Sequence, residues 1–283
     1  MNDEHAILAC TPRALRDEEI EHLHEHGWAR LEALIEPEIA LAALERSRRF
    51  VGRIGVDTFL GEDIDLDTVV ADYHHPSRED DLLNALATHR VLGEHAAVLL
   101  GEPGRQVRLL ADTLVGSFPP GHLTYFRDDR AAVEATDFHQ GQPFIPFDRR
   151  AVSFRISLHA TAATAMPMRF LSGSHRCGLL GRAISASPGE RWPSLAGCAL
   201  SAPFALEPGD ATVHLSDLVR GYPPRGPGGT ARGYVLVYLP ATACFTGMPS
   251  SLTDGLGLTP LAPVPAEHPA FPLVGHGQAT RSG

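Results

Sequence analysis

Apolar residues recur at helical spacing in the first third of the chain. Residues 17–26 form an acidic segment that stops at Gly27, and residues 37–50 open on a proline and place apolar side chains on one stripe. Both segments are therefore predicted to be helices. Between them, residues 28–34 alternate apolar and polar side chains, which is typical of a strand.

The helical part extends through residues 80–100, where we predict a pair of helices with a break near Gly93. From residue 105 the pattern changes to short apolar runs separated by turns rich in Gly and Pro. The runs that we predict to be strands are 107–117, 152–160, 168–171, 211–215 and 233–239. Several short strands at this spacing predict a β-sandwich or barrel.

These elements predict a single domain, residues 1–283, that is mainly β with flanking helices. A mostly helical flank at 17–104 precedes a β core at 105–240, and an irregular tail follows at 241–283. A chain of 283 residues is long enough to bury a sizeable core.

Composition narrows the class of protein. Hydrophobic residues make up 43% and charged residues 20% of the chain, as in ordinary soluble globular proteins. No apolar run of about 18 residues predicts a membrane span, and the acidic start lacks a signal-peptide pattern. The net charge of −10 argues against a nucleic-acid partner. We therefore expect a cytoplasmic protein with a small-molecule substrate, no nucleic-acid or membrane partner, and a possible homodimer or a heterodimer with a homologue.

The basic residues and the cysteines exclude or disfavour particular kinds of site. All 24 basic residues are arginine, so a lysine Schiff base is excluded. The four cysteines are widely and irregularly spaced, which argues against a zinc site or a disulfide framework and favours free thiols.

The clearest pair of titratable side chains is Asp137 and His139. Residues two apart in a strand project to the same face, so the carboxylate could orient the imidazole and raise its basicity. His139 would then be a general base. The alternative is that Asp137 makes an outward salt bridge and that His139 packs against Phe138 and Phe144.

Several motifs, in their order along the chain, resemble the phytanoyl-CoA dioxygenase family of Fe(II)/2-oxoglutarate oxygenases. The resemblance extends from about Glu18 to Pro240. It rests on Gly27-Trp28 before a strand, Phe138-His139-Gln140-Gly141-Gln142-Pro143-Phe144, Leu171-Ser172-Gly173-Ser174-His175-Arg176, Glu207-Pro208-Gly209-Asp210 and Tyr238-Leu239-Pro240. The fold that it implies is a double-stranded β-helix, a jelly-roll or cupin-like barrel with flanking helices.

The resemblance also implies a metal triad, which this chain matches only in part. The family holds iron with a His-x-Asp/Glu motif and a distant His, and an Arg about a dozen residues later binds 2-oxoglutarate. Here His139 is retained, Gly141 stands at the carboxylate position, and Arg220 stands at the position of the distant His. Arg232 matches the co-substrate arginine. His139 is thus the only retained ligand, and we predict no metal site of the family's type.

Arginine cannot ligate a metal, because its guanidinium stays protonated. Arg220 and Arg232 are instead predicted to bind an anionic group of the substrate, with Gln142 and Tyr222 as further contacts. The alternative is that Arg220 forms a structural ion pair with Asp217 or Asp210. A halogenase, in which halide fills the place of the missing carboxylate, fits Gly141 but would need another histidine, and His214 is the nearest along the chain.

The leading hypothesis is therefore an enzyme that acts on a small acidic or oxygen-rich natural product without oxidation, by cyclisation, elimination or isomerisation. His139, Asp137 and Arg220 would be its catalytic residues, and no cofactor is expected. One alternative is an active oxygenase that keeps Fe(II) and 2-oxoglutarate and uses Asp137 as the missing carboxylate. Another is an inactive partner subunit of a homologue.

Overall fold

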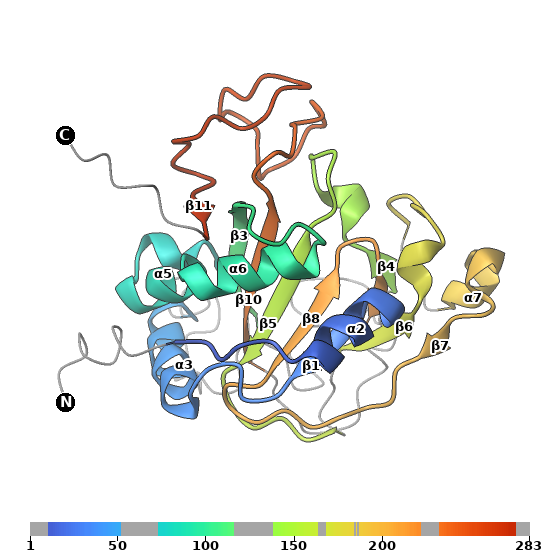
Figure 1. The fold of residues 1–283 in the computed structure, drawn as a ribbon, viewed down its shortest axis with the longest axis horizontal. Helices are drawn as coiled ribbons and strands as arrows, with labels where there is room; N and C mark the ends of the chain where they lie inside the picture. The colour runs from blue at the N-terminus through green and yellow to red at the C-terminus, as the bar shows by residue number, and fades with distance from the viewer. Residues whose placement is uncertain are drawn as a thin grey trace, which may run out of the picture.

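The computed structural model describes residues 11–51, 73–115, 138–163, 168–183, 185, 187–221 and 232–275, which form two β-sheets and a layer of helices (Figure 1). The strands of the larger sheet lie in the order β1-β8-β5-β10-β3-β11, and β2 also pairs with β3. The smaller sheet has the order β4-β9-β6-β7. The mainly β class with flanking helices is confirmed.

The elements keep the order expected from the sequence. The helices are α2 (Asp17–His26), α3 (Pro37–Val51), α5 (Asp81–Ala87), α6 (Arg90–Leu99) and the short α7 (Pro188–Arg191). The strands of the larger sheet are β1 (Trp28–Leu31), β2 (Tyr73–His74), β3 (Val107–Val115), β5 (Val152–Ser157), β8 (Ala211–Leu215), β10 (Gly233–Pro240) and β11 (Leu273–Val274). Those of the smaller sheet are β4 (His139–Gln140), β6 (Arg169–Ser172), β7 (Ala199–Leu200) and β9 (Val219–Gly221).

The break between α5 and α6 lies at Thr88–His89, so the break predicted near Gly93 is wrong. Gly93 lies inside α6, where a Cβ atom would come within 2.7 Å of the Gly275 nitrogen and of the Val274 side chain. Glycine is needed here because the segment Val274–Gly275 passes close to the helix. In the sequence alone, such a glycine looks like a helix breaker.

One face of the larger sheet is apolar and packs against α2, α3, α5 and α6, which lie across it in Figure 1. Alternate residues of each central strand supply this face, among them Phe154, Val213 and Leu236, all fully buried. The hydroxyls of Tyr234 and Tyr238 on β10 donate to the carbonyl oxygens of Leu83 and Ala87, at 3.1 and 3.0 Å. These bonds attach α5 to the sheet.

The other residues of the same strands give the larger sheet an inner face of different character. On β1, β8 and β5 these residues are Trp28, Arg30, Thr212, His214, Ser153, Arg155 and Ser157. Most of them are buried, whereas Val235 and Val237 on β10 and Thr113 on β3 are partly exposed. The inner face is thus polar, enclosed towards β8 and more accessible towards β3.

Aromatic rings connect this inner face to the smaller sheet. The Trp28 ring of β1 stacks on the Phe170 ring of β6, with centroids 4.8 Å apart, and on Phe204, with centroids 5.8 Å apart. Phe170 also lies 5.6 Å from the ring of His214 on β8. The smaller sheet therefore covers the inner face at its β1–β8 side.

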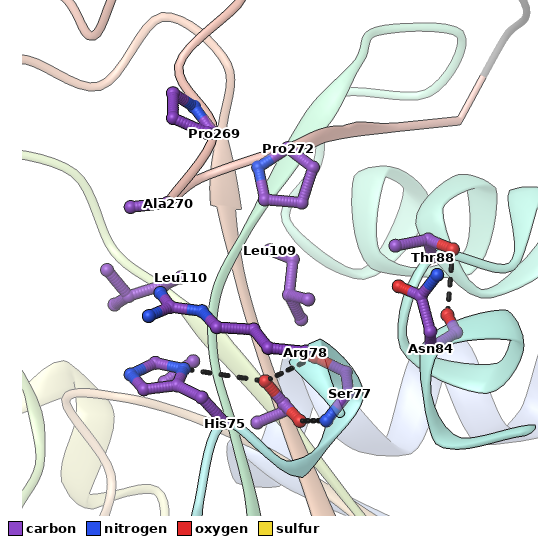
Figure 2. A pocket seen from close by; sticks show the side chains of 12 residues that line it. His75, Ser77, Arg78, Asn84, Thr88, Leu109, Leu110, Pro269, Ala270 and Pro272 are labelled. Carbon is purple, nitrogen blue, oxygen red and sulfur yellow. Dashed lines mark hydrogen bonds and ion pairs between the residues drawn. The ribbon is translucent and has the colours of Figure 1, made fainter. Parts of the chain in front are cut away.

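A pocket of about 90 Å³ lies on the helix-covered side of β3, between Pro76–Arg78 and residues 269–272. His75 and Ser77, labelled in Figure 2, direct polar atoms to one carboxylate. The hydrogen bonds and the ion pair identify this carboxylate as that of Asp112. Asp112 is 1% exposed and accepts hydrogen bonds from the Ser77 backbone N–H, the Ser77 hydroxyl and the Tyr234 hydroxyl, each at 2.9 Å. His75 Nδ1 lies 3.5 Å from the same group. The carboxylate therefore holds the segment before α5 against the sheet.

We expect Asp112→Asn to lower the free energy of unfolding by about 3 kcal/mol, because an amide cannot accept all of these bonds. Burial raises the pKa of Asp112, but hydrogen bonds from His75, Ser77 and Tyr234 lower it overall below the ordinary carboxyl value. Its contribution is therefore present above the unfolded-state pKa and is lost as pH falls through the lower folded-state pKa. Urea denaturation at neutral and acidic pH measures both effects.

The exposed Asp81 in the first turn of α5 provides the control. Asp81→Asn should change stability by about 0.5 kcal/mol or less. Equal losses for the two variants would contradict the structural role of Asp112.

Candidate active site

His139 and Arg220 lie directly opposite each other in the smaller sheet. β4 and β9 pair antiparallel with His139 against Arg220, and β6 continues the row with Phe170 against Arg220. Directly opposed residues of antiparallel strands project to the same side. The three side chains therefore share the face that meets the larger sheet, and the two residues predicted from distant parts of the sequence are neighbours.

The guanidinium of Arg220 occupies the space beside Gly141. A Cβ atom at position 141 would lie 2.9 Å from Arg220 Nη1 and 3.2 Å from Nη2. Gly141 has φ −78° and ψ −33°, a conformation open to any residue. The glycine therefore leaves room for the end of the Arg220 side chain, which would have to shift to admit a larger residue at position 141. The backbone conformation itself does not require glycine.

The two carboxylates considered as structural partners of Arg220 are paired with other arginines. Asp217 contacts Arg150 at 2.5 Å, and Asp210 contacts Arg30 at 3.0 Å. Burial raises the pKa of Asp217, and the charge of Arg150 opposes that shift. Each of the two carboxylates thus has another arginine as its ion-pair partner, and the alternative in which Arg220 pairs with one of them stays a prediction.

His214, regarded in the sequence only as a poor metal-ligand candidate, lies beside this row. It is 2% exposed on the inner face of β8. Burial first, and then electrostatic interactions with Arg220, His139 and Arg155, hold the pKa of His214 well below its usual value. The imidazole is therefore neutral at pH 7.

Arg155 was missed altogether by the sequence reasoning. It lies 8% exposed on the inner face of β5 and is directly opposite Thr212 of β8. The alternation of Ser153, Arg155 and Ser157 with apolar residues could have indicated a polar inner face. Nothing in the order of residues showed that this face meets His139.

Of the four other predicted site residues, Arg232 and Gln142 lie within the described residues. Arg232 is 7% exposed and directly precedes β10, where its carbonyl oxygen accepts the Leu158 N–H at 3.0 Å. Gln142 uses its amide within the protein, donating to the Phe147 and Arg149 carbonyl oxygens and accepting from the Ser216 hydroxyl. Asp137 and Tyr222 lie outside the described residues.

Across the described ranges, no group of three or more His, Cys, Asp and Glu side chains is placed to hold a metal ion. Within the same part of the chain, no helix is long and apolar enough to cross a membrane.

A family model for phytanoyl-CoA dioxygenase (PhyH) matches residues 23–221. This is most of the chain, and the chain therefore belongs to the phytanoyl-CoA dioxygenase family. A search of curated protein sequences gave no significant match.

Solved structures show the same fold. The carbocyclase SnoK from nogalamycin biosynthesis, described as non-heme and alpha-ketoglutarate dependent, has a TM-score of 0.71 and 17% identity, over 93% of this chain and 99% of SnoK. The epimerase SnoN in complex with Fe3+, alpha ketoglutarate and nogalamycin RO has a TM-score of 0.65 and 19% identity, over 96% and 99%. EvdO2 from Micromonospora carbonacea var. aurantiaca, complexed with 2-oxoglutarate, has a TM-score of 0.56 and 18% identity, over 86% and 98%. The two facing sheets are thus a double-stranded β-helix, as predicted.

Proposed function

We propose that this protein is a small-molecule enzyme on the phytanoyl-CoA dioxygenase scaffold that catalyses a non-oxidative acid–base step. One observation carries the proposal. The Arg220 guanidinium fills the space beside Gly141, directly across from His139. A positive charge thus lies where the family places the iron and its carboxylate ligand.

The residues present do not fit an iron site of the family's type. His139 is the only triad ligand retained, and Gly141 has no donor atom. A guanidinium remains protonated and cannot bind a metal, and its charge would repel Fe(II). We therefore propose a reaction that uses neither iron nor another cofactor. Fe(II) and 2-oxoglutarate belong to the alternative, in which the oxygenase activity is kept.

The site supports proton transfer beside a fixed cation. In this proposal His139 removes a proton from a carbon acid, with Asp137 orienting its ring, as their spacing in the sequence suggests. Arg220 stabilises the negative charge that develops on the substrate oxygen, as an oxyanion-binding group does. Arg232 binds a carboxylate of the substrate, and Gln142 and Tyr222 stay predictions from the sequence as further substrate contacts.

The likeness to natural-product enzymes supports the substrate class. SnoK is described as a carbocyclase and SnoN as an epimerase, both from nogalamycin biosynthesis. Ring closure and epimerisation both rearrange an existing carbon skeleton. We propose a similar oxygen-rich small molecule here, transformed by cyclisation, elimination or isomerisation in the cytoplasm, by the chain alone or as a homodimer or heterodimer.

Loading the protein with Fe(II) under anaerobic conditions tests the proposal. After desalting, we expect well below one iron per chain, and no consumption of 2-oxoglutarate on exposure to O₂, because the donor set is incomplete. Metal analysis and 2-oxoglutarate quantification give the two readouts.

The variant His139→Ala serves as the control. Any iron bound nonspecifically to surface groups should be equal in the two proteins. One iron per wild-type chain, lost in His139→Ala and accompanied by 2-oxoglutarate turnover, would reject the proposal in favour of an active oxygenase.

A further inference from the structure

Two polar side chains on the inner face of β8 are buried without a hydrogen-bond partner among the described residues. Thr212 and His214 are each 2% exposed. The Thr212 hydroxyl and both ring nitrogens of His214 lack a partner within that part of the chain. Buried polar groups are nearly always hydrogen-bonded, because leaving them unsatisfied opposes folding. These three atoms therefore indicate that a bound group completes the site.

A second buried histidine shows what a purely structural role looks like in this fold. His95 is 8% exposed, and its Nε2 lies 2.7 Å from the carbonyl oxygen of Arg13. The ring of His95 thus attaches α6 to the N-terminal segment. His214 makes no such bond from either ring nitrogen.

Arginine side chains lie near these polar groups. Thr212 lies directly opposite Arg155 on β5. Its neighbour on β1, Arg30, already pairs with Asp210 and Glu32. Arg220, His139 and Arg155 are close enough to His214 to depress its pKa, after the larger effect of burial. A neutral imidazole carries one donor and one acceptor. Together these groups suit a ligand that carries both an anionic oxygen and a hydroxyl group.

Aromatic rings flank His214 on two sides. Trp28 is its direct neighbour on β1, and the ring of Phe170 lies 5.6 Å away across the two sheets. The Trp28 ring already stacks on Phe170 and Phe204, so a ligand beside His214 would meet these rings mainly through edge contacts. Edge contacts between flat π-systems are favourable, which suits a planar, unsaturated ligand.

We propose that Thr212, His214 and Arg155 form a subsite for the oxygen atoms of a planar phenolic or enolic acid. His214 and Thr212 hydrogen-bond the hydroxyl or carbonyl oxygen, and Arg155 pairs with the anionic group. The inference rests on the proposed function, since it places the same ligand between the two sheets and within reach of His139 and Arg220.

Calorimetric titration with two matched acids tests the subsite. 1-Hydroxy-2-naphthoate carries the adjacent hydroxyl, and 2-naphthoate lacks it. We expect the wild type to bind the hydroxylated acid about tenfold more tightly, the effect of one buried hydrogen bond. His214→Phe should abolish this preference, Thr212→Val should reduce it, and His214→Gln should retain part of it.

Stability of the ligand-free protein separates a binding role from a structural one. His214→Phe removes unsatisfied polar atoms, so its thermal midpoint should equal or exceed that of the wild type. His95→Phe is the matched control. It leaves a carbonyl oxygen unsatisfied, so its midpoint should fall while the preference for the hydroxylated acid persists.

Three results would each overturn the subsite: no binding of either acid at millimolar concentration, a preference that survives in His214→Phe, or a fall in the midpoint of His214→Phe like that of His95→Phe. The iron-loading result is independent of these. A wild type that binds stoichiometric iron and still shows the His214-dependent preference would reject the proposed function and keep the subsite.

Discussion

The double variant Gly141→Asp/Arg220→His is expected to bind Fe(II) on the order of 10³-fold more tightly than the wild type, about 4 kcal/mol. It restores a carboxylate and a second imidazole around His139 and removes a guanidinium charge. The backbone at position 141 allows the change, since its φ of −78° suits any residue. The atoms within 3.4 Å of a new Cβ are two guanidinium nitrogens, which the second substitution removes, and the Ser216 carbonyl oxygen at 3.4 Å.

Single variants isolate the contribution of each position. Gly141→Asp alone should not gain iron, because its carboxylate would pair with the Arg220 guanidinium beside it. Arg220→Ala alone should gain little, because it removes charge without supplying a donor. Adding His139→Ala to the double variant should abolish the gain.

Anaerobic titration of Fe(II), followed by desalting and metal analysis, gives the affinities. A double variant that folds normally and binds no more iron than the wild type would mean that His139, position 141 and position 220 do not converge on one point. The geometry on which the proposed function rests would then be wrong.

The second large effect is expected at Asp210, the last residue of the Pro-Gly-Asp turn. We expect Asp210→Ala to lower the free energy of unfolding by about 3–5 kcal/mol. The carboxylate is 5% exposed and accepts the backbone N–H groups of Ala33 and Glu207 at 2.8 and 3.1 Å. It also pairs with Arg30 at 3.0 Å. Its removal leaves the two N–H groups unsatisfied where β1 meets β8 and takes from Arg30 the shorter of its ion pairs, since only Glu32, at 3.4 Å, remains.

Urea denaturation monitored by circular dichroism measures this loss. Asp148→Ala is a matched control, because Asp148 is exposed and accepts a hydrogen bond from the Cys244 backbone N–H at 2.7 Å. It should cost about 1 kcal/mol or less. A similar loss in both variants would show that Asp210 does not hold the edge of the larger sheet.

The sequence predicted the elements best where a local rule decides them. The α2 helix spans Asp17–His26 as expected, because Gly27 ends it with φ +84°, a conformation that favours glycine. The β8 strand spans Ala211–Leu215 as expected, because its neighbours are turn residues. Gly93 was misassigned because its close contact with Val274 and Gly275 joins residues far apart in the chain.

The sequence motifs predicted two neighbouring residues of the candidate site, both on the smaller sheet. Their spacing relative to the family pattern identified His139 and Arg220, which the structure pairs across β4 and β9. The site residues of the larger sheet could not be predicted in this way. No sequence motif contains Arg155 or His214, and only the packing of the two sheets brings their face into the site.

The sequence by itself determined the class of fold, the family and the mismatched triad, because helical and strand periodicities and short motifs are local properties of the chain. Tertiary structure alone decided that the Arg220 guanidinium fills the space beside Gly141, that Asp210 and Asp217 pair with other arginines, and that His214 lies near His139, Arg220 and Arg155. The physical reason is that strand register and sheet packing determine which side chains, distant in the sequence, come into contact. Neither the composition nor the spacing of residues specifies that register by itself.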